Sequence, residues 1–246
     1  MTVGARFTIQ LLREAGIAPG MSVLDIGCGG GLLTRDVAEL VGPGGRVLGI
    51  DRNPMVLNLA DGTPASGKGR IDYRQVDLAA LPDDLGSFDA IVGRRVLMYL
   101  ESPGSVLAAL AERLNPDGIV AVHEHNNAPL PNRISMPAHE EAQGWIFDTI
   151  RAEGTEPEIG FMLYDLFIGA GLTGVRLKVE ANVQTPGQPY ALSSIVRGMK
   201  ERAIRFGVVA DEAEMRLDTL DERLAEEAAT GTWLADLMFG AWGRRA

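Results

Sequence analysis

The chain has 246 residues, of which 46% are hydrophobic and 23% are charged, and its formal net charge is −10. This composition is that of a globular protein. The acidic balance argues against a surface built to neutralise phosphates, so we expect a small-molecule substrate and no nucleic-acid partner. The length suits a single domain over residues 1–246 that carries insertions.

Cys28 is the single cysteine, which excludes an intrachain disulfide and a cysteine-based zinc cluster and favours a reducing compartment. Arg13 and Glu14 interrupt the apolar residues near the start, so that stretch lacks the hydrophobic core of a secretory signal. No apolar run approaches transmembrane length. We therefore expect a cytoplasmic protein with no membrane partner.

The first 125 residues predict strands and helices in alternation, after a short leading helix over 7–12. Such alternation favours a parallel sheet with helices on both faces. Strands are expected over 21–25, 46–51, 71–77, 88–94 and 118–125, and helices over 32–42, 54–60 and 106–114.

The second half is less regular, and we interpret 126–163 and 187–229 as insertions that cover the substrate. Strands are expected over 174–184 and 233–245, which completes seven. The acidic residues between 211 and 227 are interpreted as a solvated helix face. The prediction is an α/β, Rossmann-like, seven-stranded, mostly parallel sheet with helices on both faces and added helical lid segments.

A glycine cluster follows the first predicted strand in the sequence Asp25-Ile26-Gly27-Cys28-Gly29-Gly30-Gly31. Glycines at a strand-to-helix turn let the backbone approach a ligand closely. A dinucleotide-binding loop requires a further glycine or alanine, but Leu32 or Thr34 stands there, depending on which glycine starts the count. The spacing is instead D-x-G-x-G-x-G.

Two further acids end the next predicted strands, Asp51 after the second and Asp77 after the third. The carboxyl ends of neighbouring parallel strands open into one crevice, so these acids are expected to face the same ligand as the glycine cluster.

In this arrangement, residues 20–125 resemble class I S-adenosylmethionine-dependent methyltransferases. The match includes FDAIVGRRVLMYL and LNPDGIVAVHEH, where Asp117 replaces a glycine of the family's turn. The resemblance implies S-adenosylmethionine as cofactor, S-adenosylhomocysteine as product, and 20–125 as the cofactor-binding core. The implied cofactor-binding residues are Asp25, Gly27, Gly29, Gly31, Asp51, Arg52, Asp77, Leu78, Gly93 and Arg94.

The resemblance also assigns roles to some of these residues. Asp51 would accept hydrogen bonds from the ribose hydroxyls, and Asp77 would bind the adenine amino group with the Leu78 backbone beside the ring. The backbone of Gly93 and Arg94 would meet the amino group of the cofactor.

The acceptor is expected to be a small molecule, and methylation of oxygen is favoured over nitrogen or carbon. Residues 93–95 lack the Asn/Asp-Pro-Pro-Tyr/Phe turn of enzymes that methylate base amino groups, and Cys28 lies inside the glycine cluster, where it is not expected to act as a nucleophile. The alternatives are a protein of the same fold that binds the cofactor without transferring methyl, and an NAD-dependent oxidoreductase.

A hydroxyl acceptor would benefit from a general base, for which His123 and His125 are the candidates. Period-two alternation puts both on one face of the fifth predicted strand and Glu124 on the other. Each histidine is equally well explained as a hydrogen-bonded residue at a strand end. No third ligand at recognisable spacing completes a metal site, so none is predicted.

Four apolar or aromatic residues are candidates for the walls of the acceptor pocket, although isolated aromatics are more often core residues. These wall candidates are Tyr99, Trp145, Phe161 and Met162.

A homodimer is compatible with the sequence.

Overall fold

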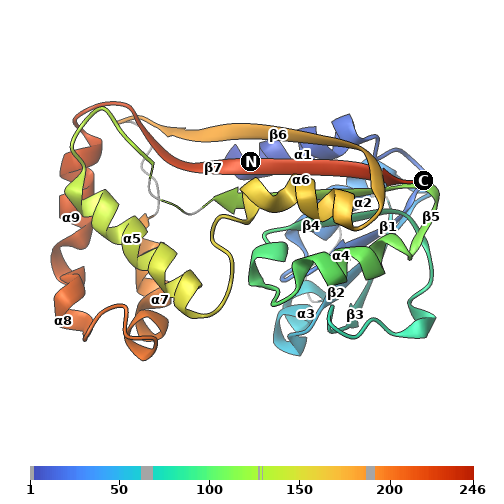
Figure 1. Ribbon diagram of the computed structural model, residues 1–246, viewed down its shortest axis with the longest axis horizontal. Coiled ribbons are helices and arrows are strands. Elements are labelled where there is room, and N and C mark those ends of the chain that lie inside the picture. Colours follow the sequence, from blue (N-terminus) through green and yellow to red (C-terminus); the bar gives the residue numbers. More distant parts are fainter. Residues whose placement is uncertain (1–2, 62–68, 127, 129, 187–191) are drawn as a thin grey trace. The chain divides into compact units, whose positions relative to one another are not determined.

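The computed structural model describes residues 3–61, 69–126, 128, 130–186 and 192–246 (Figure 1). Its strands are β1 (Ser22–Ile26), β2 (Arg46–Asp51), β3 (Arg70–Gln75), β4 (Phe88–Arg94), β5 (Leu114–Asn126), β6 (Leu172–Gln184) and β7 (Trp233–Arg245). Its α-helices are α1 (Val3–Ala15), α2 (Leu32–Val41), α3 (Pro54–Asp61), α4 (Pro103–Ala111), α5 (Pro137–Ala152), α6 (Ile159–Gly169), α7 (Leu192–Arg205), α8 (Glu212–Met215) and α9 (Leu217–Ala228). Two 3₁₀ turns are η1 (Asp83–Leu85) and η2 (Leu97–Tyr99).

The strands form one sheet in the order β3-β2-β1-β4-β5-β7-β6. β1 pairs in parallel with both β2 and β4, β2 pairs in parallel with β3, and β4 pairs in parallel with β5. The strand order therefore reverses between β1 and β4, which is where open α/β sheets bind ligands. The predicted seven-stranded, mostly parallel, Rossmann-like sheet is confirmed.

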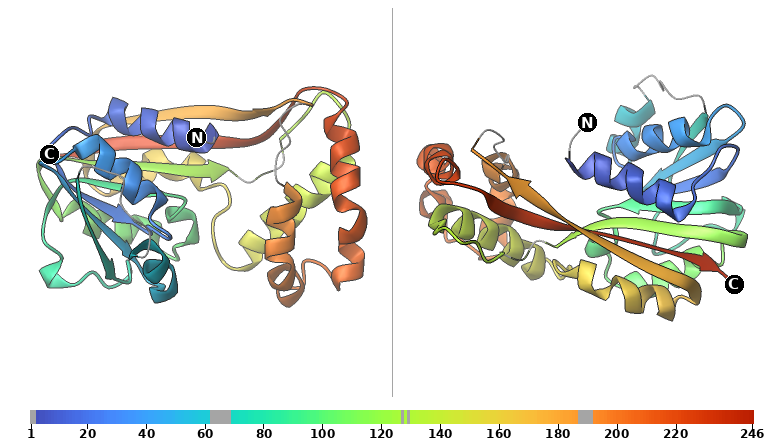
Figure 2. Two further views of the ribbon diagram at one scale, coloured as in Figure 1. Left: turned by 180° about the vertical axis from the view of Figure 1, so that it is seen from behind. Right: turned by 90° about the horizontal axis from the view of Figure 1, so that it is seen from above.

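The face of the sheet under α1 and α2 is filled by small and β-branched side chains. Ile119 and Ala121 of β5 pack there with Leu12 and Ala15 of α1 and with Val37 of α2. Alternation along β5 assigns His123 to the same face as Ile119 and Ala121. Figure 2 shows α1 and α2 on this face and α4 and α6 on the other.

The turn at the start of β5 explains why Asp117 can stand where the family has a glycine. Asp117 has φ 59°, a left-handed conformation that glycine adopts at least cost and aspartate tolerates better than most residues. The Asp117 carbonyl accepts a hydrogen bond from Nη1 of Arg244 at 3.1 Å. The predicted turn is therefore present, with an aspartate in the position that favours glycine.

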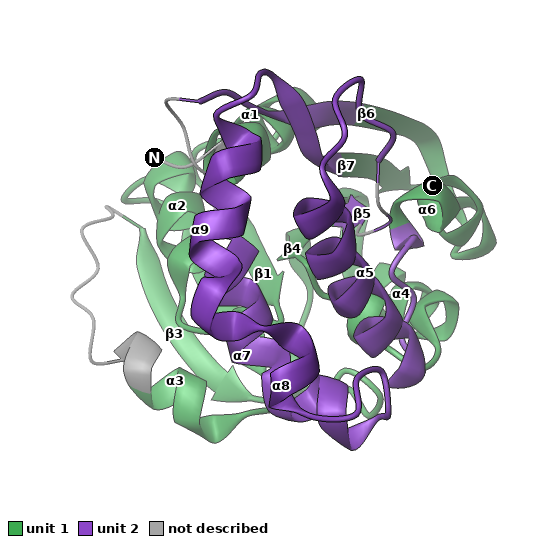
Figure 3. Ribbon diagram, turned by 90° about the vertical axis from the view of Figure 1, so that its left-hand side faces the viewer, with its two compact units in different colours: residues 1–124, 160–178, 239–246 green, residues 125–159, 179–238 purple. Residues whose placement is uncertain are grey.

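The chain divides into two compact units (Figure 3). Unit 1 comprises residues 1–124, 160–178 and 239–246, and unit 2 comprises residues 125–159 and 179–238. Unit 2 thus contains most of both segments predicted as insertions. Residues 127, 129 and 187–191 of those segments lie outside the described part of the chain.

Unit 2 is built on α5, α7, α8 and α9. Helix α9 buries Leu217, Leu220 and Leu224 at the spacing expected of one helical face, as its sequence predicted. Its opposite face carries the acidic residues, but Glu227 departs from the solvated face that we predicted. The side chain of Glu227 is only 16% exposed and pairs with His139 Nδ1 at 2.7 Å.

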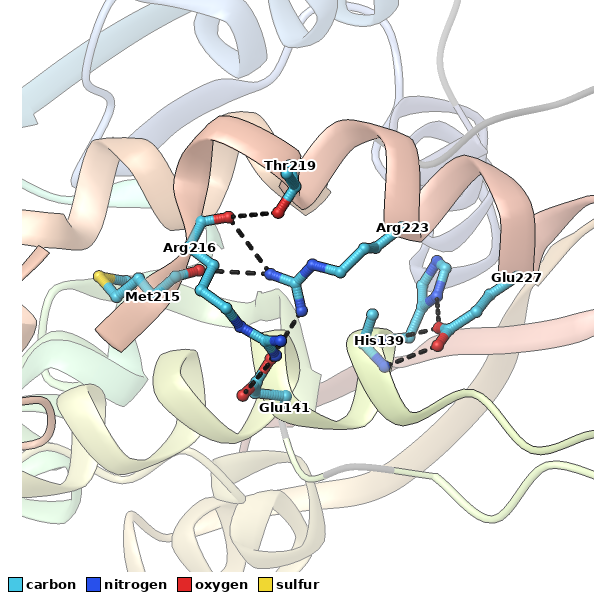
Figure 4. Close-up of polar contacts among 8 residues, drawn as sticks. His139, Glu141, Met215, Arg216, Thr219, Arg223 and Glu227 are labelled. Carbon is cyan, nitrogen blue, oxygen red and sulfur yellow. Dashed lines mark hydrogen bonds and ion pairs between the residues drawn. The ribbon is translucent and has the colours of Figure 1, made fainter. Parts of the chain in front are cut away.

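Polar contacts join α5 to α9 inside unit 2 (Figure 4). Oε1 of Glu227 accepts the Ala138 N–H at 2.7 Å, and Oε2 accepts the His139 N–H at 3.0 Å. These are first-turn amides of α5, which have no partner within their own helix. Nearer α8, Glu141 pairs with Arg223 at 3.0 Å and with Arg216 at 3.2 Å.

None of the helices in the described ranges combines the length and the apolar character needed to cross a membrane.

Candidate cofactor pocket

A pocket of about 210 Å³ opens in unit 1 at the carboxyl ends of the central strands. Residues from the turns after β1, β2, β3 and β4 contribute to it, as expected where the strand order reverses. The lining residues are Gly27, Asp51, Arg52, Val76, Asp77, Leu78, Arg95, Val96, Tyr99 and Leu100. Gly27 of the glycine cluster therefore lines the same pocket as Asp51 and Asp77.

The glycine turn after β1 has the backbone that its sequence requires. Gly27, Gly29 and Gly31 have φ of 55°, 51° and 73°, values that side-chain-bearing residues rarely adopt. A Cβ added at Gly27 would lie 2.7 Å from the Val96 side chain, whereas one at Gly29 would meet nothing within 4 Å. Gly27 therefore permits close packing, and open space lies in front of Gly29.

Asp51 connects this turn to the end of β2. Its Oδ2 accepts the Gly29 N–H at 3.0 Å, and its Oδ1 accepts the Asn53 N–H at 2.9 Å. At the end of β3, Asp77 is exposed and accepts the Ala79 N–H at 2.9 Å. Each carboxylate is oriented by backbone amides and retains acceptor capacity for a ligand.

Asp25 lies behind the pocket rather than in its lining. It is fully buried, and its Oδ2 accepts a hydrogen bond from Thr34 Oγ1 of α2 at 2.6 Å. Burial raises the pKa of Asp25 to about 7, and the Thr34 hydrogen bond opposes that rise. Asp25 thus anchors the start of α2 to β1 and supports the glycine turn. Four other predicted cofactor residues are outside the lining, namely Gly29 and Gly31 of the glycine turn and Gly93 and Arg94 at the end of β4.

The segment after β4 supplies a wall that we did not predict. Arg95, Val96 and Leu100 line the pocket together with Tyr99, which we had expected to contact the acceptor. The wall is held by Glu124, which we had described only as occupying the opposite face from the histidines. An acid two residues after the last apolar residue of β5, Val122, is the sequence signal that could have identified it.

The two candidate bases occupy different environments. His123 is fully buried, its Nδ1 lies 2.8 Å from Thr8 Oγ1, and its ring packs edge-on against Phe7 at 4.8 Å. Because α1 covers its face of the sheet, His123 does not line the pocket. His125 belongs to unit 2, where its Nδ1 lies 3.0 Å from Oδ2 of Asp236.

The remaining wall candidates are not in the pocket lining of unit 1. Phe161 and Met162 are on α6 and are 61% and 41% exposed, and the Phe161 ring contacts Phe239 at 4.9 Å. Trp145 is a half-buried residue of α5 in unit 2.

The residues of this pocket fit a nucleoside cofactor. Asp51 offers carboxylate oxygens to a pair of hydroxyls, Asp77 can accept a hydrogen bond from a base amino group, and Leu78 supplies an apolar contact. The open space at Gly29 accommodates close approach to the backbone. The strand order and this pocket agree with the class I methyltransferase fold that the sequence resembles.

Comparison with known proteins agrees with that class. The profile of a family described as "Methyltransferase domain" matches residues 17–159, more than half of the chain. The chain belongs to this family. The match does not favour the NAD-dependent oxidoreductase alternative.

Among curated relatives, the chain is 34% identical over 122 residues to a ubiquinone biosynthesis O-methyltransferase of Nitrosococcus oceani, which covers 49% of the chain and 50% of the relative. Matches to curated relatives of this name in three genera cover 46–63% of each relative's length.

Solved structures share the fold over nearly the whole chain. The YcgJ protein from Bacillus subtilis has a TM-score of 0.63 at 16% identity, covering 98% of this chain and 99% of that one. A phosphoethanolamine N-methyltransferase 2 from Haemonchus contortus, in complex with S-adenosylhomocysteine, has a TM-score of 0.60 at 17% identity. The match covers 98% of this chain and 53% of that one. At these identities the likeness concerns the fold alone.

Proposed function

We propose that this protein transfers a methyl group from S-adenosylmethionine to a small-molecule acceptor, with a hydroxyl oxygen as the favoured nucleophile. The observation that carries the proposal is the pocket in which Asp51 and Asp77 accompany the glycine turn at the switch point of the sheet. The family match and the neighbour that holds S-adenosylhomocysteine support the same cofactor.

The residues of the pocket divide the work of binding. Asp51 would accept hydrogen bonds from the ribose, and Asp77 with Leu78 would hold the adenine. The glycine turn at Gly27, Gly29 and Gly31 would let the backbone approach the rest of the cofactor. The backbone of Gly93 and Arg94 at the end of β4 would meet its amino group. The bound cofactor supplies a methyl group on a sulfonium centre that is already electrophilic, so the protein contributes mainly alignment.

Two observations favour oxygen as the methylated atom. The curated relatives are named O-methyltransferases. Nδ1 of His125 lies 3.0 Å from Oδ2 of Asp236, a contact that would orient the ring. We keep His123 and His125 as the candidate bases that would take the hydroxyl proton.

Other features of the function remain proposals from the sequence. We propose a cytoplasmic protein that acts on a small metabolite without nucleic acid and that is compatible with a homodimer. Tyr99 is the favoured acceptor contact, because it lines the pocket and is 40% exposed.

The test is to incubate the protein with methyl-labelled S-adenosylmethionine and a bacterial metabolite extract, and to identify labelled products by mass spectrometry. We expect a labelled small molecule with the label on oxygen, together with S-adenosylhomocysteine. A protein that binds the cofactor tightly but labels nothing would support the non-methylating alternative.

A further inference from the structure

The segment after β4 is attached to β5 by three successive backbone amides. The Arg95 N–H donates to the His123 carbonyl at 2.8 Å. The N–H groups of Val96 and Leu97 both donate to Oε1 of Glu124, at 2.9 Å and 2.8 Å. A single buried carboxylate therefore holds two consecutive peptide groups of the pocket wall.

These contacts hold the backbone in a conformation that its sequence does not favour. Arg95 has φ 58°, and a left-handed conformation costs a residue with a side chain roughly 1 kcal/mol. The next side chain, Val96, packs against the turn at Gly27, where no Cβ would fit. Two hydrogen bonds to a buried carboxyl oxygen are strong enough to offset the strain at Arg95.

The carboxylate is costly in itself. Glu124 is fully buried, and its Oε2 has no hydrogen-bond partner among the described residues. Burial raises the pKa of Glu124 to about 7, against the lowering effect of the Val96 and Leu97 amides. An apolar residue would avoid this cost at the end of an apolar strand, so the benefit of Glu124 lies in the segment that it holds.

We propose that Glu124 is a positioning residue for cofactor binding, which fixes residues 95–97 so that Arg95, Val96 and Tyr99 form one wall of the pocket. It acts through Val96 and Leu97 rather than by touching the ligand. This inference rests on the proposed function, because it takes the pocket to be the cofactor site.

The experiment compares wild type with Glu124→Ala, Glu124→Gln and a control, Asp89→Asn. Asp89 is a carboxylate of the same strand pair that accepts the Ser22 N–H at 2.8 Å and the Asn115 Nδ2–H at 2.7 Å, away from the pocket. Amide hydrogen exchange at Val96 and Leu97 reports the attachment, and calorimetric titration with S-adenosylhomocysteine reports the pocket.

We expect Glu124→Ala to expose the amides of Val96 and Leu97 to exchange and to weaken S-adenosylhomocysteine binding roughly tenfold. Glu124→Gln keeps an acceptor oxygen, so it should retain part of the exchange protection and part of the S-adenosylhomocysteine affinity. Asp89→Asn should leave both unchanged even if it lowers stability. A folded Glu124→Ala protein with fast exchange at Val96 and Leu97 and wild-type affinity would overturn the proposal.

A pH series adds a readout that a purely structural role would not move. Only wild type carries an ionisable group at position 124, so the affinity difference between wild type and Glu124→Gln should widen as the pH rises through 7. The charge of Arg95 lowers the pKa of Glu124, and Arg95 and Asp25 are present in both proteins, so the difference isolates Glu124. A constant difference would reject the proposal. Wild type that fails to bind S-adenosylhomocysteine at all would instead reject the proposed function.

Discussion

The two units satisfy their least exposed acidic side chains in different ways. Unit 1 buries Asp25 and Glu124, and among the described residues their hydrogen-bond donors are the Thr34 hydroxyl and the backbone amides of Val96 and Leu97. Unit 2 pairs its acids with cations or an imidazole across helices, as Glu227 does with His139 and Glu141 does with Arg223. Asp25 and Glu124 of unit 1 support a pocket, whereas Glu227 and Glu141 of unit 2 hold helices together.

This difference has an energetic consequence. A buried carboxyl solvated only by neutral donors resists ionisation, so at neutral pH it lowers the stability of the fold that contains it. A carboxylate that accepts helix amides and an imidazole proton contributes to stability instead. Substitutions can separate the buried carboxyls that support the pocket from the paired carboxylates that join helices.

The largest expected effect is the pH dependence of unit 1. The pKa values of Asp25 and Glu124 rise to about 7 in the folded chain, from ordinary values of 3.8 and 4.5. The folded state keeps protons that the unfolded state releases, so stability falls as pH rises from about 4 to about 7, by on the order of 3 kcal/mol per carboxyl. Urea unfolding of wild type, Asp25→Asn and Glu124→Gln across this range measures it. If the unfolding free energy of all three proteins changed equally with pH, the buried carboxyls would not be the cause of the pH dependence.

The next effect concerns the helices of unit 2. Glu227→Ala removes the acceptor of two α5 amides and the partner of His139, whose side chain is only 5% exposed. We expect a loss of about 2 kcal/mol in unfolding free energy. Trp233, whose ring lies 4.3 Å from that of His139, provides a fluorescence signal. Glu226→Ala, at an exposed neighbouring position, is the control, and equal losses in the two variants would contradict this role.

In unit 1, substitution of Asp51 is expected to lower cofactor affinity. Asp51→Ala should weaken S-adenosylhomocysteine binding by about 1 to 3 kcal/mol, because ribose hydroxyls lose their acceptor. Isothermal titration measures the change, with Asp72→Ala on the exposed part of β3 as the control. Unchanged affinity in Asp51→Ala would exclude Asp51 from the site.

The smallest effect is expected at the partly exposed ion pairs. Glu141→Gln removes the partner of Arg216 and Arg223, with Glu141 35% exposed, and should cost about 0.5 to 1 kcal/mol. Glu140→Gln on the exposed side of α5 is the matched control. Thermal unfolding in low and high salt distinguishes them, since only the first variant should lose its salt-sensitive contribution.

Local sequence patterns predicted the parts of the molecule that depend on near neighbours. The alternation of strands and helices predicted the sheet, and the glycine turn with Asp51 and Asp77 predicted half of the pocket. Val96 and Glu124 were missed because their contact joins residues 28 apart along the chain. Glu227 was placed on a solvated face because its partner His139 lies 88 residues away. Tertiary pairings of this kind leave no periodic signal in the sequence.

A crystal structure of the protein with S-adenosylhomocysteine tests the central claim most directly. The account predicts the ribose against Asp51, the adenine beside Asp77 and Leu78, and the Arg95–Tyr99 segment along the remaining wall. A nucleoside bound elsewhere, with Asp51 and Asp77 facing away from it, would contradict the account.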